Sequence, residues 1–172
     1  MSQEPVGFNL LGLPSIALEH VIRTMDLEAM FFFSLTSRKA KSILNYSLPK
    51  SYFHVEYGFM SLKFVVIGSP TQNLIIRTNL YLSEEKSRSY KIQGIMYKMR
   101  KVNDRIQINW DEPFQTGMET LMTHFAESFR FPKVSMDFET DVEPETSLAL
   151  LNHAKSLNAQ LLEIDMHLQR NS

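Results

Sequence analysis

Histidine is the side chain best suited to bind a transition metal or to move a proton near neutral pH, and this sequence of 172 residues contains five histidines and no cysteine. The histidines are His20, His54, His124, His153 and His167. They lack the spacing of a metal site, and the His-Glu-x-x-His pattern is absent. We therefore predict neither a metal site nor a cofactor. His124 and His153 occupy matching positions in two similar stretches, which favours a shared packing or surface role.

Carboxylates concentrate in one short stretch, which contains Asp137, Glu139, Asp141, Glu143 and Glu145. Carboxylate oxygens are typical ligands of calcium, but the EF-hand loop pattern and its glycine are missing here. We therefore expect a solvated loop between a strand and a helix.

Cations concentrate earlier in the chain, at Lys86, Arg88, Lys91, Lys98, Arg100, Lys101 and Arg105. A basic patch is typical of nucleic-acid binding, but no recognised nucleic-acid-binding motif accompanies this one, and the formal net charge of the chain is −1. We predict no nucleic-acid partner. Separate basic and acidic patches would instead orient a protein target and raise its association rate.

Other catalytic signatures are missing as well. The sequence has no nucleophile elbow, no phosphate-binding glycine loop and no dinucleotide fingerprint, so we predict that the chain is not an enzyme. The longest apolar clusters, residues 30–33 and 64–67, are much shorter than the roughly 20 residues of a membrane-spanning helix. The N-terminus lacks the features of a signal peptide. We expect a soluble intracellular protein, cytoplasmic and/or nuclear, without a membrane partner.

The elements that would position these side chains begin with three short helices. Pro14 suits the first residue of a helix, and a buried stripe follows at the spacing of one helix face, formed by Leu18, Val21, Ile22 and Met25. Asp26 can cap a second helix, in which residues 30–33 are all apolar. Ser37 can cap a third helix, and Pro49 closes the unit.

From about residue 51 the pattern changes to short segments rich in β-branched and aromatic residues. They predict strands at residues 52–59, 62–67, 74–82, 90–99 and 105–110, with a turn at residues 102–104. In the last third, the pattern predicts a helix followed by a strand, twice. The helices are predicted at residues 116–129 and 145–157, and the strands at residues 133–138 and 162–166.

The last third also contains a weak internal repeat. Residues 121–124 and 150–153 align at a separation of 29 residues, at the upper edge of the leucine-rich-repeat range. The chain ends at Ser172 without the polar capping unit that a solenoid requires. We therefore expect leucine-rich-repeat-like helix–strand units in a truncated protein.

The N-terminal unit resembles the F-box, in the variety abundant in nematode proteins. The residues that carry this resemblance are Leu13-Pro14, Leu18, Val21-Ile22, Met25-Asp26, Leu35 and Ser37-Arg38-Lys39. The chain departs from the general F-box at Ile16, where Glu is common, and at Ala40, where an aromatic residue is common; residues 34–40 follow the nematode variety.

The remainder resembles the F-box-associated (type 2) region of the same proteins, through its strands, Asn109-Trp110 and the late helix–strand alternation. The resemblance implies an α+β protein: an N-terminal tail at residues 1–8, a three-helix F-box at residues 9–50, and an incomplete α/β region at residues 51–172.

The resemblance also implies an adaptor without catalysis. The F-box would bind a Skp-type adaptor and, through it, a cullin scaffold, and the C-terminal region would hold an unidentified protein target. The adaptor-binding residues would be Leu13, Pro14, Leu18, Val21, Ile22 and Leu35. Residues 30–33 have more apolar surface than three short helices can bury, so we expect the excess to be buried against partner helices rather than against the chain's own strands.

Two alternatives remain open. A truncated F-box protein would bind the adaptor without delivering a target, and would compete with intact F-box proteins. A small enzyme or nucleic-acid binder would instead require a pocket with converging polar groups or salt-sensitive binding of oligonucleotides.

Overall fold

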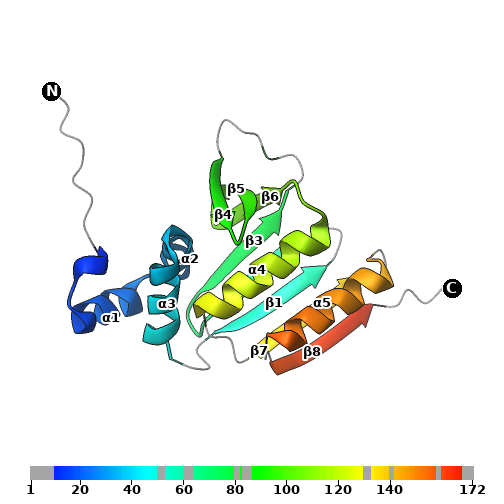
Figure 1. Ribbon diagram of the computed structural model, residues 1–172. Coiled ribbons are helices and arrows are strands. Elements are labelled where there is room, and N and C mark those ends of the chain that lie inside the picture. Colours follow the sequence, from blue (N-terminus) through cyan, green and yellow to red (C-terminus); the bar gives the residue numbers. More distant parts are fainter. Residues whose placement is uncertain are drawn as a thin grey trace.

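The computed structural model describes residues 10–49, 53–59, 64–79, 82, 87–129, 133–139, 142–157 and 160–167. Its N-terminal part is a group of three short helices preceded by one 3₁₀ turn (Figure 1). These elements are η1 (Leu10–Gly12), α1 (Ser15–Thr24), α2 (Leu27–Thr36) and α3 (Arg38–Ser47). The three helices confirm the sequence prediction. The position of Pro14 differs from the prediction by one residue, because it is the N-cap residue that precedes α1 and Ser15 is the first helical residue.

Two polar side chains determine where α2 and α3 begin, as the sequence predicts. Asp26 caps α2, because its Oδ1 accepts a hydrogen bond from the Ala29 N–H at 2.6 Å. Ser37 caps α3, because its Oγ accepts a hydrogen bond from the Ala40 N–H at 3.1 Å. Each cap satisfies a backbone N–H that has no partner within the first helical turn.

The C-terminal part is built on one mixed sheet of eight strands in the order β4-β5-β6-β3-β2-β1-β7-β8. Its strands are β1 (His54–Phe59), β2 (Phe64–Gly68), β3 (Asn73–Thr78), β4 (Arg88–Ile92), β5 (Ile95–Val102), β6 (Arg105–Trp110), β7 (Lys133–Glu139) and β8 (Gln160–His167). The pairs β1–β7, β7–β8 and β3–β6 are parallel, and the other pairs are antiparallel. Helices and a mixed sheet together confirm the α+β class.

One strand prediction is wrong. The sequence predicts a single strand over residues 90–99, but a tight hairpin there joins β4 to β5. The two residues of the turn are Gln93 and Gly94, and both have positive φ, at 47° and 101°. This is the geometry of the two-residue turn that matches the twist of a hairpin, and it favours glycine at its second position. The predicted turn at residues 102–104 is confirmed between β5 and β6.

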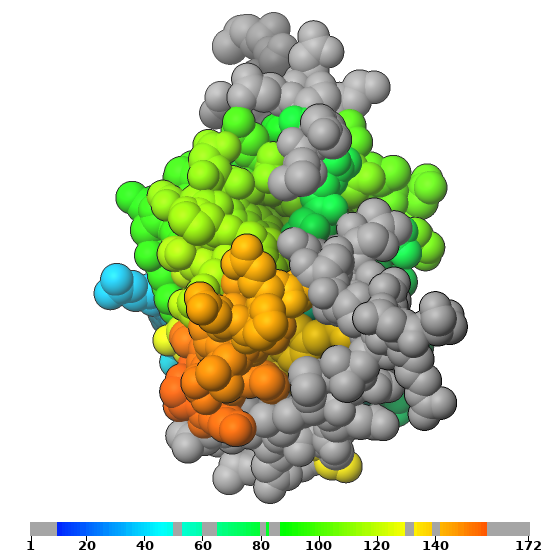
Figure 2. All heavy atoms as spheres, turned by 90° about the vertical axis from the view of Figure 1, so that its right-hand side faces the viewer, coloured from blue at the N-terminus to red at the C-terminus, as the bar shows by residue number. Residues whose placement is uncertain are grey.

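Two helices cover one face of the sheet, α4 (Phe114–Phe129) and α5 (Pro144–Ser156), and they lie side by side (Figures 1 and 2). Alternate strand residues point toward them, so that Ile106 and Ile108 of β6 are buried. α4 approaches β6 so closely that a Cβ added at Gly117 would lie 2.0 Å from Nε1 of Trp110. The helix–strand alternation of the last third is therefore confirmed, whereas the leucine-rich-repeat character of these units stays a prediction.

The carboxylates of the acidic stretch are distributed over several elements. Asp137 and Glu139 belong to β7, Glu143 precedes α5, and Glu145 lies in its first turn. Asp141 lies outside the described residues. The sequence predicts a solvated loop between a strand and a helix, and of the four described carboxylates only Glu143 lies between β7 and α5.

The helical part packs on the C-terminal part through α2 and α3, with α3 against α4 and α2 against β3, β4 and α4. Met30 and Phe31 are buried, and the ring of Phe31 lies 5.8 Å from the ring of Phe125 in α4. The half-buried ring of Phe32 lies 5.7 Å from the ring of Tyr90 in β4. Met30 and Phe31 are thus buried within the chain, whereas Phe32 and Phe33 are half-buried. Burial of their remaining apolar surface by a partner stays a prediction. Within the described ranges, no helix combines the length and the apolar character that a membrane crossing requires.

This shared core predicts that the helical and sheet parts unfold together. The substitution Phe31→Ala removes a fully buried ring, so it should lower the free energy of unfolding by about 3–5 kcal/mol. Urea unfolding followed by Trp110 fluorescence and by far-ultraviolet circular dichroism should give one coincident transition. Phe33→Ala is the control, and its cost should be smaller because that ring is only half-buried. Separate transitions for the two signals would contradict a shared core.

Candidate docking surface

The six residues predicted to bind an adaptor divide into two groups in the structure. Leu18 and Ile22 point into the core and are 7% and 0% exposed. The other four lie at the surface, with Pro14 exposed and the rest half-buried, namely Leu13, Val21 and Leu35. Leu18 and Ile22 therefore hold α1 in place within this chain, while the other four remain accessible to a second protein.

Ile16 in the first turn of α1 belongs to the accessible surface, and the sequence reasoning did not select it. Its side chain is 84% exposed. The available signal was its position, because Ile16 falls outside the buried stripe formed by Leu18 and Ile22. A large aliphatic side chain that is almost fully exposed at the first turn of a helix has no role in the core of this chain. It is a candidate contact for a partner.

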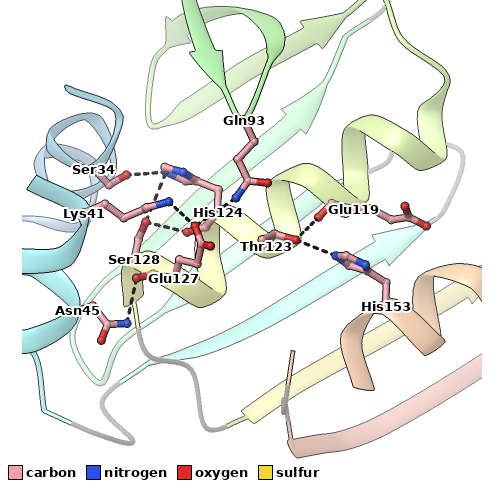
Figure 3. A network of polar contacts seen from close by, with 10 residues as sticks. All are labelled: Ser34, Lys41, Asn45, Gln93, Glu119, Thr123, His124, Glu127, Ser128 and His153. Atoms are coloured by element: carbon pink, nitrogen blue, oxygen red, sulfur yellow. Dashed lines mark hydrogen bonds and ion pairs between the residues drawn. The ribbon is translucent and has the colours of Figure 1, made fainter. Parts of the chain in front are cut away.

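A polar network on the other side of the helical part joins it to the C-terminal part (Figure 3). Glu127 of α4 is its centre and forms an ion pair with Lys41 of α3. The Glu127 carboxylate also accepts a hydrogen bond from Gln93 Nε2 at 3.1 Å, and its backbone carbonyl accepts one from Asn45 Nδ2 at 2.9 Å. One residue of α4 thus contacts both α3 and the β4–β5 turn.

His124 lies next to this network and bonds to α2. Its ring Nε2 is 2.8 Å from Ser34 Oγ, and both side chains are buried. The Ser34 hydroxyl donates its proton to the Phe31 carbonyl oxygen at 2.6 Å, so we assign the proton of the His124–Ser34 bond to Nε2. A serine whose proton is directed to a backbone carbonyl is not activated as a nucleophile. The Ser34–His124 pair therefore connects two helices.

The protonation of His124 is shifted by its surroundings. Burial is the largest cause, the nearby Lys41 ammonium adds to it and Glu127 opposes it, and together they lower the pKa of His124 to about 4. The ring is therefore neutral at neutral pH. His153, the other histidine singled out by its position, is half-buried in α5 and pairs with Thr123 Oγ1 of α4 at 2.8 Å. Each histidine thus forms a hydrogen bond with a hydroxyl group of another helix: His124 joins α4 to α2, and His153 joins α5 to α4.

Two further contacts join α2 to the sheet. Glu28 forms an ion pair with Lys101 of β5 at 2.7 Å. The Leu27 N–H at the start of α2 donates to the Gln72 side-chain carbonyl at 3.0 Å. Both pairs combine residues far apart in the sequence, so no local pattern could have predicted them. They help to fix the orientation of α2 relative to the sheet.

An open cleft of about 620 Å³ separates the α2–α3 turn from the β4–β5 turn. Leu35 and Arg38 line it on the helical side, and Lys91 and Gln93 line it on the sheet side. The predicted docking residue Leu35 therefore lies beside residues of the C-terminal part.

In the part of the chain that the structure describes, no group of three His, Asp or Glu side chains is placed to hold a metal ion.

The comparisons with known proteins agree with the helical part. Residues 10–52 match the family model of the F-box domain. The match spans η1 and the three helices and ends before β1 begins. No curated protein and no solved structure matched the chain. The domain match supports an F-box protein, and F-box proteins are generally adaptors rather than enzymes.

The lowered pKa of His124 predicts acid sensitivity. Its folded-state pKa of about 4 lies below the ordinary value of 6.5, so the unfolded chain binds this proton more tightly. The contribution of the neutral ring is complete above pH 6.5 and is lost as the pH falls toward 4. Between pH 7.5 and 4.5 the loss should reach about 2.5 kcal/mol.

Urea unfolding of the wild type and of His124→Gln across this pH range measures the effect. The pH dependence should be weaker in His124→Gln by that amount. His20→Gln is the control, because His20 is exposed on α1, and it should keep the slope of the wild type. Equal slopes for the wild type and His124→Gln would contradict the assignment.

Proposed function

We propose that this chain is a substrate-recognition adaptor of a Skp–cullin–F-box ubiquitin ligase. The observation that supports it most is the F-box match over residues 10–52, because that domain binds a Skp-type adaptor and, through it, a cullin scaffold. Catalysis would come from proximity, since the adaptor holds a target near an enzyme carried by another subunit. An intracellular site of action, cytoplasmic and/or nuclear, belongs to the same proposal.

The adaptor would dock on the accessible surface of the helical part. We define this docking surface as Leu13, Pro14, Ile16, Val21 and Leu35. Apolar side chains that are exposed in the free chain gain free energy when a partner removes them from water. Leu18 and Ile22 contribute indirectly, because they hold α1 in the position that presents Pro14 and Ile16.

The C-terminal part would hold the target protein. We infer that it is an F-box-associated (type 2) region of the nematode variety, which is supported by the strands that follow the F-box and by the late alternation of helices and strands. The contacts of His124 and Glu127 support a fixed orientation between docking surface and sheet. A target bound to the sheet would then be held at a defined position relative to the scaffold.

The substitution Ile16→Asp tests the docking surface. It places a charge in the middle of an apolar contact, so binding to a purified Skp-type adaptor should weaken by at least about 30-fold. The melting temperature should not change, because the side chain is almost fully exposed in the free chain. Affinity is measured by isothermal titration calorimetry over a panel of adaptors.

The matched control is Leu148→Asp, which changes an aliphatic residue that is 59% exposed on α5, in the C-terminal part. Its adaptor affinity should equal that of the wild type. If the folded wild-type chain binds no adaptor of the panel, the proposed function is wrong. If Ile16→Asp and Leu148→Asp weaken binding equally, the adaptor docks elsewhere.

A further inference from the structure

The face of the sheet opposite α4 and α5 is not covered by any helix of the described residues (Figure 1). Side chains alternate between the two faces along each strand, so the residues between the buried ones point to this second face. In β6 the buried residues are Ile106 and Ile108, and the residues that point to the second face are therefore Arg105, Gln107 and Asn109. These side chains are half-buried and polar, whereas the helix-covered face is apolar.

Three arginines meet on this second face in adjacent strands. Arg77 of β3 is the cross-strand partner of Gln107 in β6, and Gln107 is in turn the partner of Arg100 in β5. Strands lie about 4.8 Å apart, so Arg77 and Arg100 start roughly 10 Å apart on either side of Gln107. Arg105 precedes Gln107 by two residues in β6 and so points to the same face. We call Arg77, Arg100 and Arg105 the arginine surface.

The charge of the arginine surface is poorly compensated. The side chain of Arg77 has no hydrogen bond or ion pair with the described residues, and its Nε is buried without an acceptor. Arg100 donates from Nη2 to the side-chain oxygen of Gln107 at 2.8 Å, which is a neutral acceptor. Arg105 has only its neighbour Asp104, at 3.6 Å, and the Asp104 side chain is largely exposed. The Nε atoms of Arg100 and Arg105 are also buried without an acceptor.

Gln107 holds Arg100 of the neighbouring strand in a defined orientation. Its side-chain oxygen accepts from Arg100 and also from Asn79 Nδ2 at 3.1 Å. Half-buried arginine stems lose little further freedom when a ligand binds. All three arginine stems are half-buried and Arg100 is also held by a hydrogen bond, and guanidinium groups favour carboxylates with matching geometry.

The same cross-strand row continues to an acidic residue. From Arg77 it passes through Phe64 and Gly58 to Asp137 of β7, three strand spacings away. The row thus has a cation at one end and a carboxylate at the other. This arrangement sets both the position and the direction of an acidic segment.

We propose that the arginine surface binds an acidic segment of a partner protein through its Asp or Glu carboxylates. Alternate side chains of an extended peptide lie about 6.6 Å apart, so two or three of them span the roughly 10 Å between Arg77 and Arg100, whereas a single phosphate would reach only part of the group. Single-stranded nucleic acid fits less well, because its bases need aromatic stacking platforms. β3 has no aromatic residue, and Tyr97 and Trp110 of β5 and β6 pack against α4 on the helix-covered side. Phe64 of β2 is thus the aromatic residue that the strand register places beside Arg77, and a single aromatic residue is a small platform for a strand of bases.

This inference rests on the proposed function in one respect, because it names the surface through which the C-terminal part would hold a target. It is tested without any adaptor, so its failure and the failure of adaptor binding are separate results. The experiment uses the full chain and a fluorescein-labelled peptide of about twelve residues in which Glu and Ser alternate. When extended, a peptide of this length is long enough to cross the arginine surface. Binding is followed by fluorescence anisotropy at low ionic strength.

The test variant is Arg77→Gln/Arg100→Gln/Arg105→Gln, and its dissociation constant should be at least about tenfold higher than that of the wild type. Binding by the wild type should weaken as salt is added, because the contact is ionic. A peptide with Gln in place of Glu should not bind.

The control variant is Arg38→Gln/Lys39→Gln/Lys155→Gln, which removes the same charge from exposed positions on helices. It should bind the acidic peptide like the wild type. Equal weakening in both variants would show attraction to net charge alone and would overturn the proposal. Tighter binding of a phosphoserine peptide or of an RNA oligonucleotide of equal length would also overturn it, in favour of a different ligand class.

A second measurement does not depend on the stability of the variants. In amide nuclear magnetic resonance spectra of the wild type, the acidic peptide should shift resonances of β3, β5 and β6. The resonances of α4 and α5 should move much less. Shifts confined to the helices would place the peptide elsewhere and reject the arginine surface.

Discussion

The packing of α2 and α3 on α4 joins the helical part to the rest of the molecule. Helices of about ten residues are marginal in isolation, and α2 is apolar on nearly every side. Phe31 is fully buried and its ring lies 5.8 Å from that of Phe125, which is also fully buried. Separating the two helices would expose both rings to water at about 25 cal/mol per Å² of apolar surface. The buried residues of the F-box helices and of the sheet accordingly belong to one continuous cluster.

Polar contacts at the edge of this core select one arrangement of the two parts. Apolar packing is tolerant of small rotations, but the hydrogen bond from His124 to Ser34 and the ion pair from Lys41 to Glu127 need defined directions. Breaking the first bond would leave a buried donor without a partner, which costs about 1–3 kcal/mol. The orientation of α2 and α3 on α4 is therefore specified by polar groups and stabilised by aromatic ones.

The sequence predicts those features that a few neighbouring residues decide. Asp26 and Ser37 cap helices through bonds to residues three positions away, and the alternation of residues 105–110 is enough to identify a half-buried strand. The turn at Gln93 and Gly94 was missed because a hairpin of two short strands has the same composition as one long strand. The distinguishing signal was a single glycine in a position that requires positive φ.

The candidate sites were harder to predict, because they depend on residues distant in the sequence. Ser34 and His124 are 90 positions apart, and no pattern relates them. The periodicity of α1 identified a buried stripe, but a family resemblance does not separate residues that touch a partner from residues that support them. Burial makes this distinction, since it places Ile22 inside and Ile16 outside.

The position of the apolar and charged surfaces follows from the same packing. Because α2 uses its aromatic residues on α4 and the sheet, the exposed aliphatic surface of the F-box helices lies mainly on α1, at one end of the molecule (Figure 1). Because α4 and α5 cover only one face of the sheet, the polar residues between the buried ones lie together on the other face. These two surfaces therefore belong to different elements of one continuous hydrophobic core.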